Sequence, residues 1–267
     1  MIHYTIRQIQ TGWQFLDKGL YGTYGKGYGE IIEHPVFTFL IEGGGRKILV
    51  DTGMSDTEHS EKYHHDGRQD PGQAIHEQLE SLGIGCEEIE IIIFTHLHWD
   101  HCYNLDKFPK ATLYASETEY RFALDPIPFY WNSYEAPITG LKRPIEGRHF
   151  NLVHGEEEIV EGVRVYPTPG HSPGHMAVSV RTEAGIYSLV GDLALLRECF
   201  GPNKEKGWPL TPPGRFYNIL EIWSSMEEVI RRSDYILMTH DPLQLKYDLY
   251  PCSPDCAEFA SPAISKK

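Results

Sequence analysis

The sequence predicts an α/β protein in which two β-sheets pack together and helices cover their outer faces. Short apolar runs with strand character come in groups, and single segments with helical spacing separate these groups. The 267 residues, 40% of them hydrophobic and 23% charged, suit one large globular domain. We expect this domain to span residues 1–250, with a Ser- and Pro-containing C-terminal tail at 251–267.

Apolar runs in the first half of the chain are typical of β-strands. Residues 1–50 have β-character, and the runs at 36–41 and 47–50 flank a glycine-rich turn, which predicts a hairpin. A second apolar run, at 89–94, indicates a buried strand. An amphipathic helix is expected before it, beginning at Asp70 as the N-cap.

Two stretches lack these patterns and are predicted to be loops. Residues 54–70 contain His59, His64 and His65, which we expect in a solvated loop rather than in a metal site, because no strand or helix pins them. Residues 125–148 contain several prolines and aromatic residues, and loops of this length are usually functional. Their aromatic side chains either form a satellite core or line a substrate pocket.

The second half of the chain alternates strands with two helices. A capping box at Ser116–Glu119 opens one helix, and Asn218 caps the other, whose apolar residues follow helical spacing. Strands are expected at 111–115, 163–166, 176–180, 186–190 and 235–238.

Four side chains that can bind a metal fall within six residues, directly after the run at 89–94. They are His96, His98, Asp100 and His101. The end of a strand fixes the backbone, and the following loop can turn several side chains onto one point. Imidazole together with carboxylate suits zinc and similar divalent ions, whereas a polar loop with surface histidines would not need four such residues.

Three further residues share this placement, since His171, Asp192 and His240 each follow an expected strand. Strand ends at one edge of a sandwich converge, so these side chains can join the first four. Five histidines and two aspartates exceed the needs of one tetrahedral ion and suit two ions about 3.5 Å apart that share a carboxylate. We therefore expect two divalent ions per chain, with zinc first and iron, manganese or cobalt as alternatives.

Composition and charge exclude several other classes of protein. The net charge of −14 argues against binding to a nucleic-acid backbone, and no apolar run is long enough for a membrane span. The N-terminus lacks a signal-peptide pattern, and five cysteines do not make a disulfide framework, so we expect a cytoplasmic protein. Cys252 and Cys256 suit a local disulfide or a weak metal site. A homodimer is left open.

These motifs resemble the metallo-β-lactamase superfamily. The pattern is H-x-H-x-D-H at 96–101, a Gly-His turn at 170–171, Gly-Asp at 191–192 and a late His240. The resemblance covers residues from about 36 to 241 and implies an αββα sandwich with metals at one edge. It implies that His96, His98 and His171 hold the first metal, that Asp100, His101 and His240 hold the second, and that Asp192 bridges them.

Within that family, the chain resembles the N-acyl homoserine lactonase branch in the turn at 168–175 and in His240-Asp241. The best-known β-lactamases carry Cys in place of Asp192, and the glyoxalase II run Gly-Asp-Thr-Leu-Phe is absent. One departure is clear. The lactonases carry a Tyr three residues after the bridging Asp, and this chain has Leu195 there.

The resemblance implies a hydrolase that opens a lactone by attack of a metal-bridging hydroxide, as in quorum quenching. The lactone would be of the N-acyl homoserine type or another apolar-substituted kind. Asp100 would move a proton to the leaving group, with Asp192 as the second catalytic carboxylate. Residues from the aromatic loops are expected to bind the substrate, and Tyr130, Tyr134 or Tyr217 could replace the missing Tyr. The predicted substrate residues are Phe129, Tyr130, Trp131, Tyr134 and Tyr217.

Two alternative functions stay open at this point. A thioesterase similar to glyoxalase II could use Lys204, Lys206 and Arg215 to pair with a carboxylate-bearing thiol carrier. A non-hydrolytic redox or sensor protein could instead bind iron with the same ligands.

Overall fold

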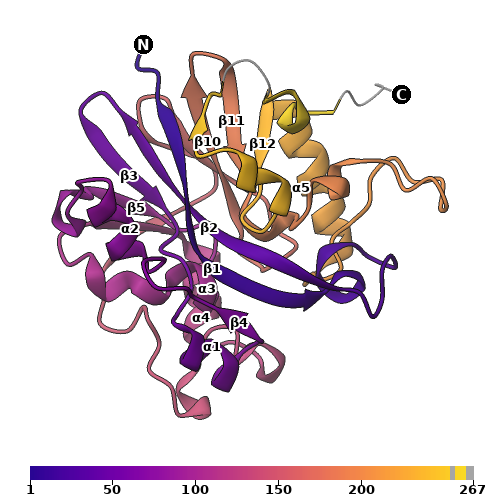
Figure 1. The fold of residues 1–267 in the computed structure, drawn as a ribbon, viewed down its shortest axis with the longest axis horizontal. Helices are drawn as coiled ribbons and strands as arrows, with labels where there is room; N and C mark the ends of the chain where they lie inside the picture. Colours follow the sequence, from indigo (N-terminus) through magenta and orange to yellow (C-terminus); the bar gives the residue numbers. More distant parts are fainter. Residues whose placement is uncertain (253–255, 263–267) are drawn as a thin grey trace.

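The computed structural model describes residues 1–252 and 256–262, except for the Cys256 side chain, and contains two β-sheets that face each other (Figure 1). The larger sheet contains β1 (Thr5–Asp17), β2 (Ile31–Gly43), β3 (Arg46–Val50), β4 (Gly67–Arg68), β5 (Ile91–Ile93), β6 (Thr112–Ser116), β7 (Phe150–Val153) and β13 (Leu249–Tyr250). The smaller sheet contains β8 (Glu157–Val160), β9 (Val163–Pro167), β10 (Met176–Thr182), β11 (Gly185–Leu189) and β12 (Tyr235–Leu237).

Strand order explains how the chain builds these sheets. In the larger sheet the order is β13-β1-β2-β3-β5-β6-β7, and β4 pairs with β1. Strand β2 is antiparallel to both of its neighbours, β1 and β3, whereas β3, β5, β6 and β7 run parallel to one another. The smaller sheet has the order β12-β11-β10-β9-β8 and is antiparallel except where β11 meets β12. The predicted α/β class with two sheets is confirmed.

Helices lie on the outer faces of the sheets. In Figure 1, α5 lies beside the smaller sheet, and α2 and α4 lie on the side of the larger sheet, in line with their contacts to β11, β1 and β6 respectively. The α-helices are α1 (Thr57–Tyr63), α2 (Ile75–Ser81), α3 (Trp99–Cys102), α4 (Glu117–Leu124) and α5 (Ile219–Arg232). Short helical turns are η1 (Lys18–Gly22), η2 (Cys86–Glu88), η3 (Tyr103–Lys107), η4 (Pro128–Tyr130), η5 (Pro137–Thr139), η6 (Gly191–Leu193), η7 (Arg197–Phe200), η8 (Pro242–Lys246) and η9 (Cys256–Phe259).

Alternate residues of the central strand β5 face two separate cores. Ile91 and Ile93 join the core between the sheets, whereas Ile92 joins the core that α2 covers with Ile75 and Leu79. Successive side chains of a strand point to opposite faces, so a strand covered on both faces is apolar throughout. This explains the unbroken apolar run from which the strand was predicted.

Most predicted elements occur near their expected places, and the start of α2 is an exception. The hairpin of β2 and β3 is confirmed, with Gly44 and Gly45 in left-handed conformations at the turn. The expected helix start at Asp70 is wrong, because α2 begins at Ile75. The backbone amide of Asp70 donates to the side-chain oxygen of Gln73 at 2.8 Å, which closes a turn before the helix.

The expectation of a solvated loop at 54–70 is also wrong. Helix α1 occupies part of it, capped by Asp56, whose carboxylate accepts from the His59 amide. The His64 side chain is only 1% exposed, and its ring stacks on Trp99 with centroids 4.0 Å apart. A buried carboxylate from a distant loop explains this order, because Glu135 Oε1 lies 2.5 Å from His59 Nε2 and 3.0 Å from His64 Nε2.

The predicted long loop at 125–148 is a connection made of turns, which include η4 and η5. Its aromatic side chains divide between packing and exposure. Tyr130 and Tyr134 belong to the core beneath α2, which favours the satellite-core alternative for these two, whereas Phe129 is 74% exposed. Trp131 donates its indole N–H to the carbonyl of Pro126 at 3.1 Å.

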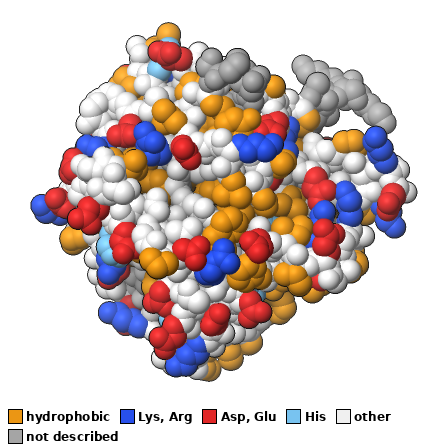
Figure 2. All heavy atoms as spheres, viewed as in Figure 1, with side chains coloured by type: hydrophobic (Ala, Val, Ile, Leu, Met, Phe, Trp, Pro, Cys, Tyr) orange, Lys and Arg blue, Asp and Glu red, His pale blue; other side chains and the backbone are white. Residues whose placement is uncertain are grey.

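Three expectations concern the surface and the tail of the chain. No described helix has the length and apolar character needed to cross a membrane. On the face shown in Figure 2, Lys and Arg side chains lie interspersed with Asp and Glu. Cys252 is disulfide-bonded, and the Cys256 side chain lies outside the described part of the structure. Phe259 of the tail is fully buried against the core between the sheets.

Candidate metal centre

The seven predicted ligand residues meet at one edge of the sandwich, and all of them are buried. Each follows the end of a strand, so the two sheets bring together residues that are up to 144 positions apart, from His96 to His240. The seven residues are His96, His98, Asp100 and His101 after β5, His171 after β9, Asp192 after β11, and His240 after β12.

The first group consists of three imidazoles. His98 Nδ1 lies 3.0 Å from both His96 Nε2 and His171 Nε2. Burial, together with the neighbouring imidazoles, holds the pKa values of His96 and His98 well below the usual range. These rings are therefore neutral near pH 7, which is the form that binds a metal.

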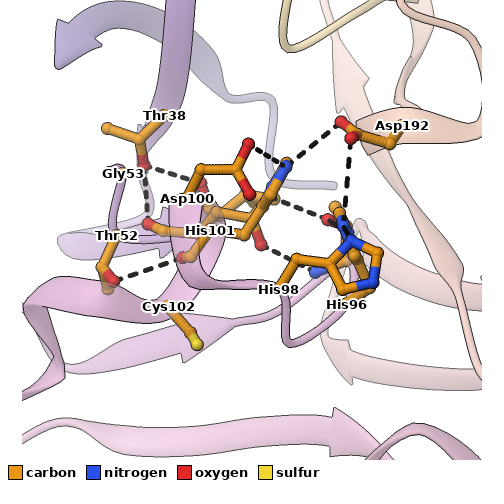
Figure 3. Close-up of polar contacts among 12 residues, drawn as sticks. Thr38, Thr52, Gly53, His96, His98, Asp100, His101, Cys102 and Asp192 are labelled. Atoms are coloured by element: carbon orange, nitrogen blue, oxygen red, sulfur yellow. Dashed lines mark hydrogen bonds and ion pairs between the residues drawn. The ribbon is translucent and has the colours of Figure 1, made fainter. Parts of the chain in front are cut away.

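The second group places two imidazoles and a carboxylate around Asp192. Asp192 Oδ1 lies 3.1 Å from His101 Nε2 and 3.1 Å from His240 Nε2. Asp100 Oδ2 lies 3.7 and 3.6 Å from the same two nitrogens. The other oxygen of Asp192 lies 3.4 Å from His171 Nε2, so each of its two oxygens faces one group (Figure 3).

Hydrogen bonds outside the cluster set the proton positions of three rings. The Asp51 carboxylate accepts from the Thr95 hydroxyl at 2.8 Å and lies 2.8 Å from His101 Nδ1. The Thr95 hydroxyl, having donated its proton, accepts from His96 Nδ1 at 3.1 Å. His240 Nδ1 donates to the carbonyl of Pro35 at 2.9 Å. In all three rings Nδ1 is thus engaged outside the cluster, and Nε2 is the atom that would bind a metal.

The residues present fit divalent cations. His101 Nε2 and Asp192 Oδ1 are buried and lie 3.1 Å apart, yet neither makes a well-aligned hydrogen bond to the other or to another described residue. Buried polar atoms in proteins nearly always have a partner, and a convergent set of imidazole nitrogens and carboxylate oxygens suits zinc or a similar ion. This satisfies the chemical requirement for a metal centre at the predicted place.

Glu119 ties the two ligand-bearing loops together, a role that sequence reasoning missed. Its carboxylate accepts from the Leu97 amide at 3.0 Å and from the Gly174 amide at 3.1 Å. It also accepts from the hydroxyls of Tyr134 at 2.7 Å and Ser172 at 2.6 Å. Burial raises its pKa against the effect of these donors. The capping pattern that revealed Glu119 as a helix residue gave no sign of this second role.

A pocket opens beside the metal cluster, and none of the five predicted substrate residues lines it. Tyr134 is committed to Glu119, Tyr130 is buried in the core, and Tyr217 is 46% exposed elsewhere. Leu195 lines the pocket, as expected for the position of the missing Tyr. The remaining lining, apart from the ligand residues, consists of Gln14, Leu16, Tyr21, His65, Trp99, Ser133 and Arg215.

Two further buried residues lie next to the ligand residues. His175 is buried, with Nδ1 2.9 Å from the Thr168 hydroxyl and its ring 5.2 Å from that of His96, which suits a supporting or core role. Cys102 is buried, and its thiol donates to the Leu97 carbonyl at 3.4 Å. Burial holds the pKa of this thiol well above its usual value, so it is no nucleophile at neutral pH.

A two-sheet sandwich with seven buried imidazole and carboxylate side chains at one edge defines a metal-dependent hydrolase. The profile of the metallo-beta-lactamase superfamily matches residues 31–232, and the chain belongs to this family. An N-acyl homoserine lactonase from Bacillus cereus is 30% identical over 184 residues, which cover 64% of this chain and 69% of that protein. The expected resemblance to the lactonase branch is thereby confirmed.

Solved structures give the same result for the fold. A quorum-quenching N-acyl homoserine lactone lactonase is 25% identical, with a TM-score of 0.74, covering 92% of this chain and 95% of that one. A mutant of AiiA from B. thuringiensis, solved with N-decanoyl-L-homoserine bound at its active site, has a TM-score of 0.75 at 25% identity. That match covers 92% of this chain and 96% of the other. The predicted αββα fold is confirmed.

Proposed function

We propose that this protein is a dinuclear metal-dependent hydrolase that opens a lactone ring. The observation that carries the proposal is Asp192, whose two oxygens face two separate groups of ligand atoms. A carboxylate in this position can be shared by two cations and offset their repulsion. The lactone comes from the relatives, which are named for N-acyl homoserine lactones.

Each residue has a defined part in this proposal. His96, His98 and His171 would hold one ion, Asp100, His101 and His240 the other, and Asp192 would lie between them. When bound, the two ions supply Lewis acidity that activates a water molecule and polarises the ester carbonyl.

Asp100 is the proton carrier in the proposal. Gln14 Nε2 donates to Asp100 Oδ2 at 2.8 Å, and both residues line the pocket. At this place in the pocket wall, the carboxylate would take a proton and pass it to the leaving alkoxide. Zinc is the expected metal, with iron, manganese and cobalt as alternatives, and quorum quenching is the proposed biological role.

A purified sample tests these proposals directly. Elemental analysis should give roughly two metal equivalents per chain, and a full-activity enzyme with one equivalent would refute the dinuclear site. Lactones and glutathione thioesters should be compared by kcat/KM, which reports transition-state stabilisation from free enzyme and substrate. Faster hydrolysis of thioesters would favour the thioesterase, and bound iron without any hydrolysis would favour the redox or sensor protein.

The thioesterase alternative has one structural observation in its favour. Of the three cations considered for a carboxylate-bearing carrier, Arg215 lines the pocket. Lys204 and Lys206 are exposed on the loop before it and do not line that pocket.

A further inference from the structure

The pocket beside the metal cluster contains a guanidinium group without an acidic partner. Arg215 Nη2 donates to the Ser133 hydroxyl at 3.0 Å. No ion pair joins Arg215 to a carboxylate among the described residues, although Lys, Arg and His pair with carboxylates at many other places in the chain. A guanidinium carries five N–H donors, so most of its hydrogen-bonding capacity is left for a ligand.

The backbone around Arg215 is held firmly on both sides. The Gly214 amide donates to the Tyr21 carbonyl at 3.0 Å, and the Tyr217 amide donates to the Gly170 carbonyl at 2.6 Å. A side chain at Gly214 would lie 2.5 Å from the backbone of Leu20, so only glycine permits this close approach. Because Gly170 precedes His171, a proposed metal ligand, this hydrogen bond joins the loop that carries Arg215 to the loop that carries His171.

Three aromatic rings surround the guanidinium. Its central carbon lies 5.8 Å from the ring centroids of Tyr21 and Tyr130 and 5.9 Å from that of Phe129. Cation–π contacts of this kind hold a guanidinium without neutralising it. Phe129 and Tyr130, predicted to touch the substrate, instead support the side chain that lines the pocket.

We propose that Arg215 forms a subsite for a carboxylate group of the substrate, so that the preferred lactone carries an acidic substituent. This inference rests on the proposed lactonase function and replaces the apolar substituent expected from the sequence. A planar guanidinium matches a carboxylate with two parallel hydrogen bonds. Leu195 offers no hydrogen bond, and Arg215 is the single Lys or Arg residue among the described residues that line this pocket.

The net charge of −14 makes a local cation necessary for the binding of an acidic substrate. An acidic protein repels anionic substrates at a distance, so selection of an acid requires a local cation inside the pocket. Arg215 provides that cation at a place where the substrate would also meet the metal ligands.

The test uses two lactones that differ only in charge. N-succinyl homoserine lactone ends in a carboxylate, and the N-succinamoyl analogue ends in an amide of nearly the same shape. The metal-loaded wild type should hydrolyse the acid with a kcat/KM at least about tenfold higher, as expected for hydrogen bonds to a charged group. Arg215→Gln should bring the ratio close to one, and Arg215→Lys should retain part of it.

The matched control is Lys206→Gln, which removes the same charge from an exposed position of the same loop and should keep the wild-type ratio. Equal rates for acid and amide in the wild type would overturn the inference. A preference for the acid that survives in Arg215→Gln would overturn it as well.

A binding measurement separates this inference from the proposed function. If the metal-loaded protein hydrolyses neither of these lactones nor N-hexanoyl homoserine lactone, the lactonase proposal fails, and calorimetry with glutarate on the metal-loaded proteins decides about the subsite. Weaker glutarate binding by Arg215→Gln than by wild type and Lys206→Gln supports the carboxylate subsite. Equal binding by all three proteins refutes it, because direct binding of glutarate to the metals would be common to them.

Discussion

Asp192→Asn is the substitution that most directly tests the dinuclear site. The carboxylate has one oxygen 3.1 Å from both His101 and His240 and the other 3.4 Å from His171. Asparagine keeps the shape and one oxygen, but it replaces the other oxygen with an NH2 group. That group cannot donate an electron pair to a cation, and the negative charge between the two groups is lost. The amide can therefore serve only one of the two metal positions.

The expected size of the effect follows from this geometry. Loss of a group that orients a metal ligand typically lowers affinity or activity by about 10–100-fold, and here the proposed ligand of both positions is altered. We expect kcat/KM to fall by about a hundredfold or more, which corresponds to at least ~2.7 kcal/mol of transition-state stabilisation. Metal content should fall from two equivalents toward one, with the group of three imidazoles, His96, His98 and His171, retaining its ion.

The assay combines elemental analysis after gel filtration, lactone hydrolysis and thermal unfolding on the same preparations. Asp106→Asn makes the same chemical change at an exposed position and serves as the control. An Asn variant at position 192 with two equivalents and wild-type turnover would show that Asp192 is no bridge, and the dinuclear proposal would fall with it.

Three other predictions follow from the same contacts. Asp51→Asn should weaken metal binding by about 10–100-fold in competition with a chelator, because the amide no longer fixes the His101 proton; unchanged affinity would refute this. Glu119→Ala should lower the free energy of unfolding by about 2–5 kcal/mol in a urea titration, since buried amides lose their acceptor. Glu117→Ala, at a half-buried position of the same helix, should cost under about 1 kcal/mol. Chelation should abolish hydrolysis and lower Tm, and zinc should restore both; an active metal-free protein would contradict the proposal.

The cluster of candidate metal ligands could be predicted from the sequence because the residues that signal it are local. An apolar strand followed by H-x-H-x-D-H places four candidate ligands within six residues. Their proximity does not depend on how the rest of the chain folds. His171, Asp192 and His240 were found by the same rule, since each follows a strand whose apolar run is visible. The strand ends then converge once the two sheets pack face to face with these ends at the same edge of the sandwich.

The pocket could not be predicted because its contacts are made across long sequence separations. Glu135 holds His59 and His64 from more than 70 residues away, and Ser133 meets Arg215 across 82 residues. Apolar periodicity carries no information about such pairs. The aromatic residues near 130 illustrate the limit, because the composition of a loop cannot tell a ring that touches substrate from one that supports an arginine.

The register between strands β3 and β5 places Asp51 beside the histidines that follow β5. Strands β3 and β5 are parallel, with Val50 opposite Ile93, so the residues after each strand are also neighbours. The Asp51 amide donates to the Ile93 carbonyl at 3.0 Å, and the residue adopts a left-handed conformation with φ of 64°. This conformation is uncommon outside glycine and marks functional positions. It turns the Asp51 carboxylate toward the Thr95 amide, 2.8 Å away, and so toward the two histidines that this aspartate orients. Once strand pairing is known, the sequence therefore indicates which residue orients the ligands. It is the Asp that directly follows the strand paired in parallel with the strand before the ligands.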